Sequence, residues 1–425
     1  MKRLYKGARV FNGHQLAAMD VLVEGERIAK TGEAIACPGA EVVAAEGLVL
    51  CPGFTDLHVH LRQPGFEAKE TIATGTAAAA AGGFTTVCAM PNLAPTPDDL
   101  QNLAPQLQAI GQDAVVRVLP YGTLTVGQKG DCPADFAVLA GFVPGFSDDG
   151  RGVQDEEMMR RLMQAVAACG RFVAQHCEVE ALLPAGGVCV QAQSAFARHH
   201  GFEGYTGESE WKMAERDIRL AAETGCRLHI CHASTKETFA LVRAAKQQGA
   251  PVTCEVTPHN LLFSCDDITE NSGRFKMNPP LRTKQDVQAA VQALLDGTVD
   301  AIATDHAPHT AKEKAGGFAH SLNGVVGLET AFAAVYTGLV VPGTLPLESA
   351  LQLFTWRPRG VLGENPQRIA PGEAADFVLL DLTTERLCEP EQFYTKGRAT
   401  PFAMRRLRGW PVETVLDGKV VYRRG

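Results

Sequence analysis

The fold is decided by one short stretch near the start of the chain, Phe54-Thr55-Asp56-Leu57-His58-Val59-His60-Leu61-Arg62. Side chains alternate along a β-strand, so His58, His60 and Arg62 point to one face of a strand here. The two imidazoles lie about 6.6 Å apart along such a strand and can converge on one metal ion at its end. A lone histidine in a barrel is more often structural. Two in phase, followed by an arginine in phase, favour a metal site.

Apolar strands alternate with helix-like stretches through the middle of the chain. The predicted strands are residues 85–89, 171–174, 227–230, 251–256 and 300–303, and examples of the helices are 71–81 and 158–168. This repetition is typical of a (β/α)₈ barrel. A doubly wound open sheet is the alternative, but no Gly-x-Gly-x-x-Gly follows the first strand. Polar residues at the C-terminal ends of several separate strands favour the barrel, because barrel enzymes keep their chemistry there.

The sequence at both ends of the chain has the pattern of short strands joined by turns. The predicted strands are residues 21–28, 41–43, 48–50, 376–380 and 412–422, and the last of these turns on Asp417-Gly418, a strong hairpin signal. We therefore predict a small β-sandwich domain formed by both termini, from residues 1–52 and 360–425, around a barrel at residues 53–359.

Composition excludes several partner classes. The chain has 40 basic and 48 acidic residues and a net charge of −8, which argues against nucleic acid or an anionic membrane as the main partner. No apolar run approaches the roughly 20 residues that cross a bilayer. The 12 cysteines are scattered through apolar segments, and no secretory leader opens the sequence. Buried reduced thiols in a cytoplasmic protein are therefore expected.

Further metal-ligand candidates lie at the ends of other predicted strands. They are Asp148 or Asp149 after residues 142–146, His176, His232 and Asp305. His229 and His306 are out of phase with these sets and are predicted either to be structural or to support the metal ligands from behind. Four histidines with two aspartates favour zinc, with manganese, cobalt or iron as alternatives. Six protein ligands are too many for one tetrahedral ion but suit two ions that share a carboxylate, with an open position for water.

The motifs together resemble a known family. They are residues 52–62, Met90-Pro91-Asn92, Phe146-Ser147-Asp148-Asp149-Gly150, Gln175-His176-Cys177-Glu178, Cys231-His232-Ala233-Ser234, Lys276-Met277-Asn278-Pro279-Pro280-Leu281-Arg282 and Ala303-Thr304-Asp305-His306-Ala307-Pro308-His309. Almost from end to end, the chain resembles the class I (bacterial) dihydroorotases of the amidohydrolase superfamily. The resemblance implies an amidohydrolase-type α/β barrel and a reversible cyclisation of N-carbamoyl-L-aspartate to L-dihydroorotate, a step of pyrimidine (UMP) biosynthesis.

The resemblance also implies a ligand set with two Zn²⁺ ions per subunit. One zinc would be held by His58, His60 and Asp305 and the other by His176 and His232, with Asp149 as the bridge. Many relatives, including hydantoinases, bridge the metals with a carboxylated lysine. No lysine occurs between Lys129 and Lys212, where that strand end must fall, so a carboxylate bridge is expected. The choice of Asp149 over Asp148 rests on the resemblance.

Four residues are expected to contact the substrate. Arg62 can bind a carboxylate through two donors, although a surface salt bridge is the alternative. By resemblance the other three are Asn92, Asn278 and His309, but Asn92 is equally well explained as a turn residue. In the hypothetical mechanism a metal-bridging hydroxide attacks the ring amide, and Asp305 acts as general acid/base by passing the proton to the departing nitrogen.

One segment departs from the family pattern. Residues 310–323 are predicted to be either a mobile loop over the substrate or a plain solvated connection, and Leu322-Asn323-Gly324 stands where the family usually has Pro-Phe-Gly. The rival predictions are a hydantoinase, dihydropyrimidinase or allantoinase, and a catalytically silent partner of aspartate transcarbamoylase. Retention of all six ligands argues against the silent partner. A homodimer is expected, and assembly of an active enzyme with aspartate transcarbamoylase stays open.

Overall fold

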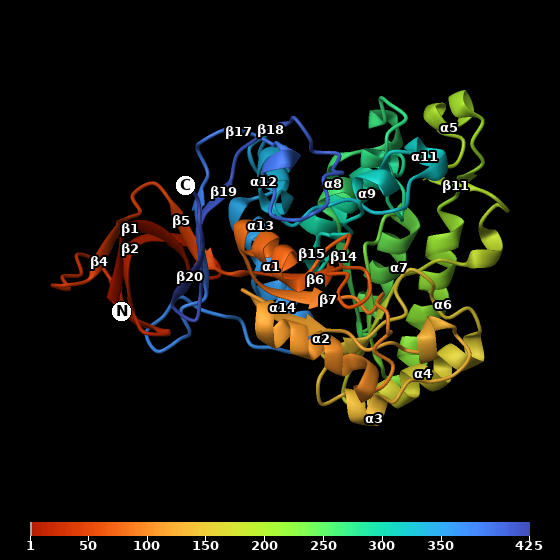
Figure 1. Ribbon diagram of the computed structural model, residues 1–425, viewed down its shortest axis with the longest axis horizontal. Helices are drawn as coiled ribbons and strands as arrows, with labels where there is room; N and C mark the ends of the chain where they lie inside the picture. Colours follow the sequence, from red (N-terminus) through yellow and green to blue (C-terminus); the bar gives the residue numbers. More distant parts are fainter. Residues whose placement is uncertain (1) are drawn as a thin grey trace.

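Strands from both ends of the chain form one sheet beside a barrel that is wrapped by helices (Figure 1). The computed structural model describes residues 2–425. Both chain ends, marked N and C, lie in the sheet and not in the barrel (Figure 1).

The terminal sheet has the strand order β20-β19-β16-β5-β1-β2-β3, with β4 also paired to β1. Its strands are β1 (Lys2–Phe11), β2 (Leu16–Glu24), β3 (Arg27–Gly32), β4 (Glu41–Ala44), β5 (Val49–Pro52), β16 (Phe377–Asp381), β19 (Trp410–Leu416) and β20 (Lys419–Arg423). Gly7 adopts a φ of 71° where the register of β1 shifts, so β1 pairs first with β4 and then with β5. Its apolar side chains, including Tyr5, Phe377 and Leu379, form a separate core.

Eight parallel strands form the barrel in the part of the chain that the structure describes. They are β6 (Phe54–Val59), β7 (Phe84–Ala89), β8 (Arg117–Pro120), β9 (Gly145–Phe146), β10 (Phe172–Gln175), β13 (Arg227–Ile230), β14 (Val252–Val256) and β15 (Ala301–Ile302). A three-stranded and a five-stranded sheet are joined by two short bridges, Gly122 with Phe146 and Val59 with His306. The second bridge brings the end of β6, which carries the histidine pair, beside the segment after β15.

Helices cover the outside of the barrel (Figure 1). The longer ones are α1 (Ile72–Ala81), α2 (Leu100–Asp113), α4 (Glu156–Ala168), α6 (Glu208–Thr224), α7 (Lys236–Gln247), α9 (Lys284–Leu295), α13 (Leu347–Phe354) and α14 (Trp356–Leu362). The shorter ones are α3 (Phe136–Leu139), α5 (Ala195–His200), α8 (Pro258–Leu262), α10 (Ala311–Lys314), α11 (Gly317–His320) and α12 (Ala331–Val335). Alanine-rich α1 begins at a Thr71 capping box and buries most of its small side chains, which lets it lie close against the barrel.

The predicted barrel with a β-rich domain from both termini is confirmed, and two local expectations differ. Phe142 is half exposed, and strand β9 covers only residues 145 and 146, so the apolar run before Asp148 is mostly not a strand. Residues 310–323 are not a plain solvated connection, because they contain α10 and α11, and Phe318 is buried. The exact domain boundaries stay a prediction; helix α14 runs across the expected one at residue 360.

The structure also bears on the expectations for membrane spans and cysteines. Within residues 2–425, no helix combines the length and the apolar character needed to pass through a lipid bilayer. All 12 cysteines are free thiols, and most of them are buried.

Candidate active site

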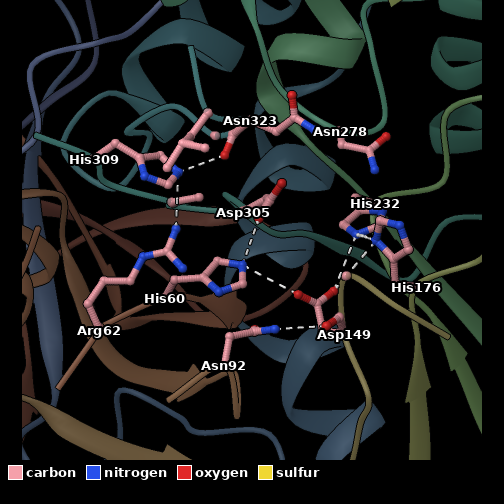
Figure 2. A pocket seen from close by; sticks show the side chains of 14 residues that line it. His60, Arg62, Asn92, Asp149, His176, His232, Asn278, Asp305, His309 and Asn323 are labelled. Carbon is pink, nitrogen blue, oxygen red and sulfur yellow. Dashed lines mark hydrogen bonds and ion pairs between the residues drawn. The ribbon is translucent and has the colours of Figure 1, made fainter. Parts of the chain in front are cut away.

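The predicted ligands come together at the C-terminal mouth of the barrel, and Figure 2 shows five of them: His60, Asp149, His176, His232 and Asp305. His58 lies on β6, and each of the other ligands lies within three residues after the end of a barrel strand. Arg62, His232 and Asp305 have φ values of 62°, 34° and 47°. Such backbone conformations are unfavourable for side-chain-bearing residues and persist where the surroundings enforce them, typically at functional sites.

Asp149 lies at the centre of two donor groups. One consists of His58, His60 and Asp149 and the other of Asp149, His176 and His232, all buried. The Asp149 carboxylate lies 3.6 Å from Nε2 of both His58 and His60, and 3.7 Å from His176 Nδ1 and His232 Nε2. Asp305 joins the first group, with its Oδ1 at 3.5 Å from His58 Nε2 and 3.2 Å from His60 Nε2.

The neighbouring carboxylate, Asp148, points away from this cluster. Its Oδ1 accepts hydrogen bonds from the backbone N–H groups of Leu124 (2.8 Å) and Thr125 (3.2 Å), and its Oδ2 accepts one from the Thr125 hydroxyl. Asp148 thus anchors the loop after β8, whereas Asp149 faces the histidines.

The electrostatics keep both site aspartates in their ionised form. Burial alone would raise the pKa of Asp149, but His58, His232 and His60 hold it well below its usual value. Burial acts in the same way on Asp305, whose pKa is lowered by His60, His58 and His232. Burial would lower the pKa of His58, but Asp149 leads the partners that raise it well above normal. Ionised carboxylates are the form that binds metals.

The donor set fits a divalent metal. His58 Nε2 and Asp149 Oδ1 are buried and have no hydrogen-bond partner, although they face each other at 3.6 Å. Two ligands of one tetrahedral zinc, each about 2.0–2.1 Å from the ion, lie roughly 3.4 Å apart. Most separations around Asp149 are therefore of the size that shared ligation produces, and an ion would satisfy the buried atoms that the protein leaves unpaired.

A cavity of about 280 Å³ opens beside the cluster. Nine of the ten predicted site residues line it, and His58 lies beneath them, fully buried. Arg62 and His309 form the wall opposite His176 and His232 (Figure 2). Asn92 donates to the Asp149 carbonyl at 2.8 Å and Asn278 donates to Glu178 at 3.0 Å.

His309 is held in one protonation state. Burial, followed by the charge of Arg62, lowers the pKa of His309 to about 3, so the ring is neutral at pH 7. Its Nε2–H donates to the Asn323 carbonyl at 2.7 Å. A hydrogen bond from this nitrogen to a substrate carboxylate would therefore have to replace the one to Asn323.

Sequence reasoning missed a residue that supports the cluster. Glu255 on β14 is fully buried, and its two oxygens lie 3.0 Å from His58 Nδ1 and 3.1 Å from His229 Nε2. A carboxylate on the second nitrogen of a metal histidine fixes its tautomer and orientation. The available signal was a charged side chain within an otherwise uncharged strand, Val252–Val256. His229 lies behind the cluster, on the Glu255 that contacts His58, and His306 faces Glu70 and Thr395.

Comparison with known proteins agrees with this geometry. A family model described as dihydro-orotase-like matches residues 47–238. Dihydroorotases of Bacillus cytotoxicus and Bacillus cereus are each 45% identical to this chain over 426 residues, which covers 100% of the chain and 99% of each relative. The chain belongs to the dihydroorotase family.

Solved structures place the dihydroorotase fold among related hydrolases. An L-hydantoinase (dihydropyrimidinase) from Arthrobacter aurescens matches with a TM-score of 0.89 and 25% identity, over 100% of this chain and 97% of that one. A dihydropyrimidinase from Brevibacillus agri matches with a TM-score of 0.85 and 22% identity, over 100% and 95%. The fold is thus shared with hydantoinases, while sequence identity is much higher with dihydroorotases.

Proposed function

We propose that this chain is a metal-dependent dihydroorotase that interconverts N-carbamoyl-L-aspartate and L-dihydroorotate. One observation carries the proposal: the cavity that holds the histidine–aspartate cluster also holds Arg62, a permanent cation, on the opposite wall. Dihydroorotate combines a cyclic amide with a carboxylate, and the two walls match these two groups. Full-length identity of 45% with dihydroorotases supports the same substrate.

The metal assignment follows the two donor groups. His58, His60 and Asp305 would hold one ion, His176 and His232 the other, and Asp149 would contact both. Histidine with carboxylate suits zinc, and two zinc ions per subunit is the proposed content. Bound there, the metals would polarise the amide carbonyl and lower the pKa of water from about 15.7 to about 7.

The protein's own groups would move the proton and hold the substrate. Asp305 is ionised, so its carboxylate can accept a proton from the attacking water and return it to the departing ring nitrogen. Arg62 would bind the substrate carboxylate, and Asn92, Asn278 and His309 would complete the contacts at the cavity wall. Ring closure consumes a proton, so acid should favour dihydroorotate.

The test is a substrate panel with metal control. Purified protein is assayed with dihydroorotate, hydantoin, dihydrouracil and allantoin, before and after chelation and after zinc return. Hydrolysis of dihydroorotate alone, lost on chelation and restored by zinc, is expected. Preference for an uncharged ring would make the chain a hydantoinase-type enzyme. Activity that survives complete metal removal would contradict the metal assignment.

A homodimer is the proposed state, and contact with aspartate transcarbamoylase is compatible with an active enzyme. Light scattering of the purified protein, alone and with aspartate transcarbamoylase, tests both.

A further inference from the structure

Two segments of the cavity wall are joined by a lysine that does not itself line the cavity. Lys314, at the end of α10, donates to three backbone carbonyls: Lys276 at 3.0 Å, Leu322 at 2.7 Å and Gly324 at 2.7 Å. Leu322 and Gly324 belong to the cavity wall, and Lys276 lies two residues before Asn278 on the neighbouring wall segment.

A second lysine strengthens the same junction. Lys276 donates through its ammonium group to the Ser321 carbonyl at 2.6 Å, and its own carbonyl accepts the Gly324 N–H at 3.0 Å. The segments 276–278 and 321–324 are therefore linked by one backbone hydrogen bond and by the side-chain amino groups of Lys276 and Lys314. The lysine-rich part of residues 310–323 is therefore tied to the cavity wall and is not the plain solvated connection that the sequence allowed.

The environment of Lys314 is unusual for a surface lysine. Burial, followed by the charge of Lys276, lowers the pKa of Lys314 to about 7. Its neighbour Glu313 pairs with Lys69 at 3.1 Å instead. At this pKa the amine is about half protonated at pH 7, and the three carbonyl oxygens are acceptors that favour its ammonium form. Lys312 offers a direct contrast, because it lies on the same short helix and is exposed.

The junction has consequences for the substrate contacts. Asn323, between the two carbonyls that Lys314 holds, accepts the hydrogen bond from His309 Nε2. Asn278 is carried by the segment on the other side of the junction. We propose that Lys314 is a positioning residue that fixes these two wall segments relative to each other, so that Asn278 and His309 meet the substrate together. The inference rests on the proposed function for its substrate, but its structural part stands on the linkage alone.

The experiment compares Lys314→Met with Lys312→Met. Loss of the three hydrogen bonds from the Lys314 amino group predicts that Lys314→Met raises the KM for dihydroorotate about 10-fold or more, with kcat changed less than about threefold and metal content unchanged. Lys312→Met should match the wild type. Lys314→Arg, which keeps a charged donor, should recover part of the KM loss.

A second measurement needs no substrate. Hydrogen exchange followed by mass spectrometry should show faster exchange of the Gly324 amide in Lys314→Met than in Lys312→Met, because this amide bonds to the Lys276 carbonyl at the junction. Unchanged KM and unchanged exchange in Lys314→Met would overturn the proposal. So would equal losses of kcat, metal and folded protein, which indicate a general structural role. If the wild type ignores dihydroorotate, the proposed function fails, while the exchange comparison still decides the linkage.

Discussion

Replacing Glu255 by Gln tests whether this buried carboxylate supports the metal-ligand cluster through its contact with His58. The substitution keeps the size of the side chain and an oxygen that can accept a hydrogen bond from His58 Nδ1. In the wild-type protein this nitrogen lies 3.0 Å from the carboxylate. It removes the negative charge that His58 and His229 share. The neutral amide should leave the fold intact but weaken metal binding by His58.

The magnitude follows from the electrostatics of Glu255. Burial would raise its pKa, but His229 and His58 lower it from 4.5 to about 2. The net shift corresponds to about 3 kcal/mol in favour of the charged carboxylate, and this remains after the cost of burying the charge has been offset. Loss of such a supporting carboxylate usually weakens metal binding by about 10–100-fold. We therefore expect zinc affinity to fall by that factor and kcat at saturating zinc to stay near the wild-type value.

The assay is competition for zinc against a chromophoric chelator, with activity measured at each zinc concentration. Glu413→Gln is the matched control, because Glu413 is also a buried carboxylate but contacts Tyr5 and Arg423 in the terminal sheet. Glu413→Gln should lower stability without changing zinc affinity. Wild-type zinc affinity in Glu255→Gln would refute the reasoning, as would an equal loss of affinity in both variants.

Three further predictions concern catalysis, specificity and stability. Asp305→Asn should lower kcat by about 10²–10⁴-fold in protein whose metal content has been measured, and near-normal turnover would remove Asp305 as the base. Arg62→Met should raise the KM for dihydroorotate by about 10–100-fold while leaving any hydrolysis of an uncharged hydantoin unchanged; parallel losses on both substrates would contradict carboxylate recognition. Burial raises the pKa of Glu329 from 4.5 to about 8, so between these values the folded protein retains a proton that the unfolded chain has lost. Stability should then fall as pH rises through this window, and Glu329→Gln should stabilise the protein by at most about 5 kcal/mol at pH 8.5 and by much less at pH 5, as read from denaturant unfolding; equal effects at both pH values would exclude this linkage.

The barrel could be predicted because its signals are local. The alternation of His58, His60 and Arg62 within one strand, and the polar residue after each later strand, appear in short stretches of sequence. Strands β8 and β9 carried much weaker signals. They are short, and parallel barrel strands gain their stability from neighbours on both sides and not from their own residues.

The support of the site could not be predicted in the same way. Glu255 acts on His58 across 197 residues of sequence, and Lys314 acts on Lys276 across 38. Nothing in the sequence around Glu255 or Lys314 identifies the partner, because each contact exists only after the barrel has closed. The sequence could not decide between Asp148 and Asp149 for the same reason. Only in the folded barrel does Asp148 meet the loop after β8, which leaves Asp149 to face the histidines.

Charge balance gives the metals a role in binding as well as in chemistry. Asp149 and Asp305 are ionised and share a cavity of about 280 Å³ with any substrate that enters. Arg62 offsets one of these negative charges, and the raised pKa of His58 lets its ring carry a proton and offset the other, while Glu255 beneath it stays ionised. In the metal-free protein the carboxylate of an anionic ring therefore meets Arg62, the permanent cation of the cavity wall. Divalent cations at the two donor groups would add positive charge beside the ring, so metal removal should weaken binding of dihydroorotate as well as abolish its turnover.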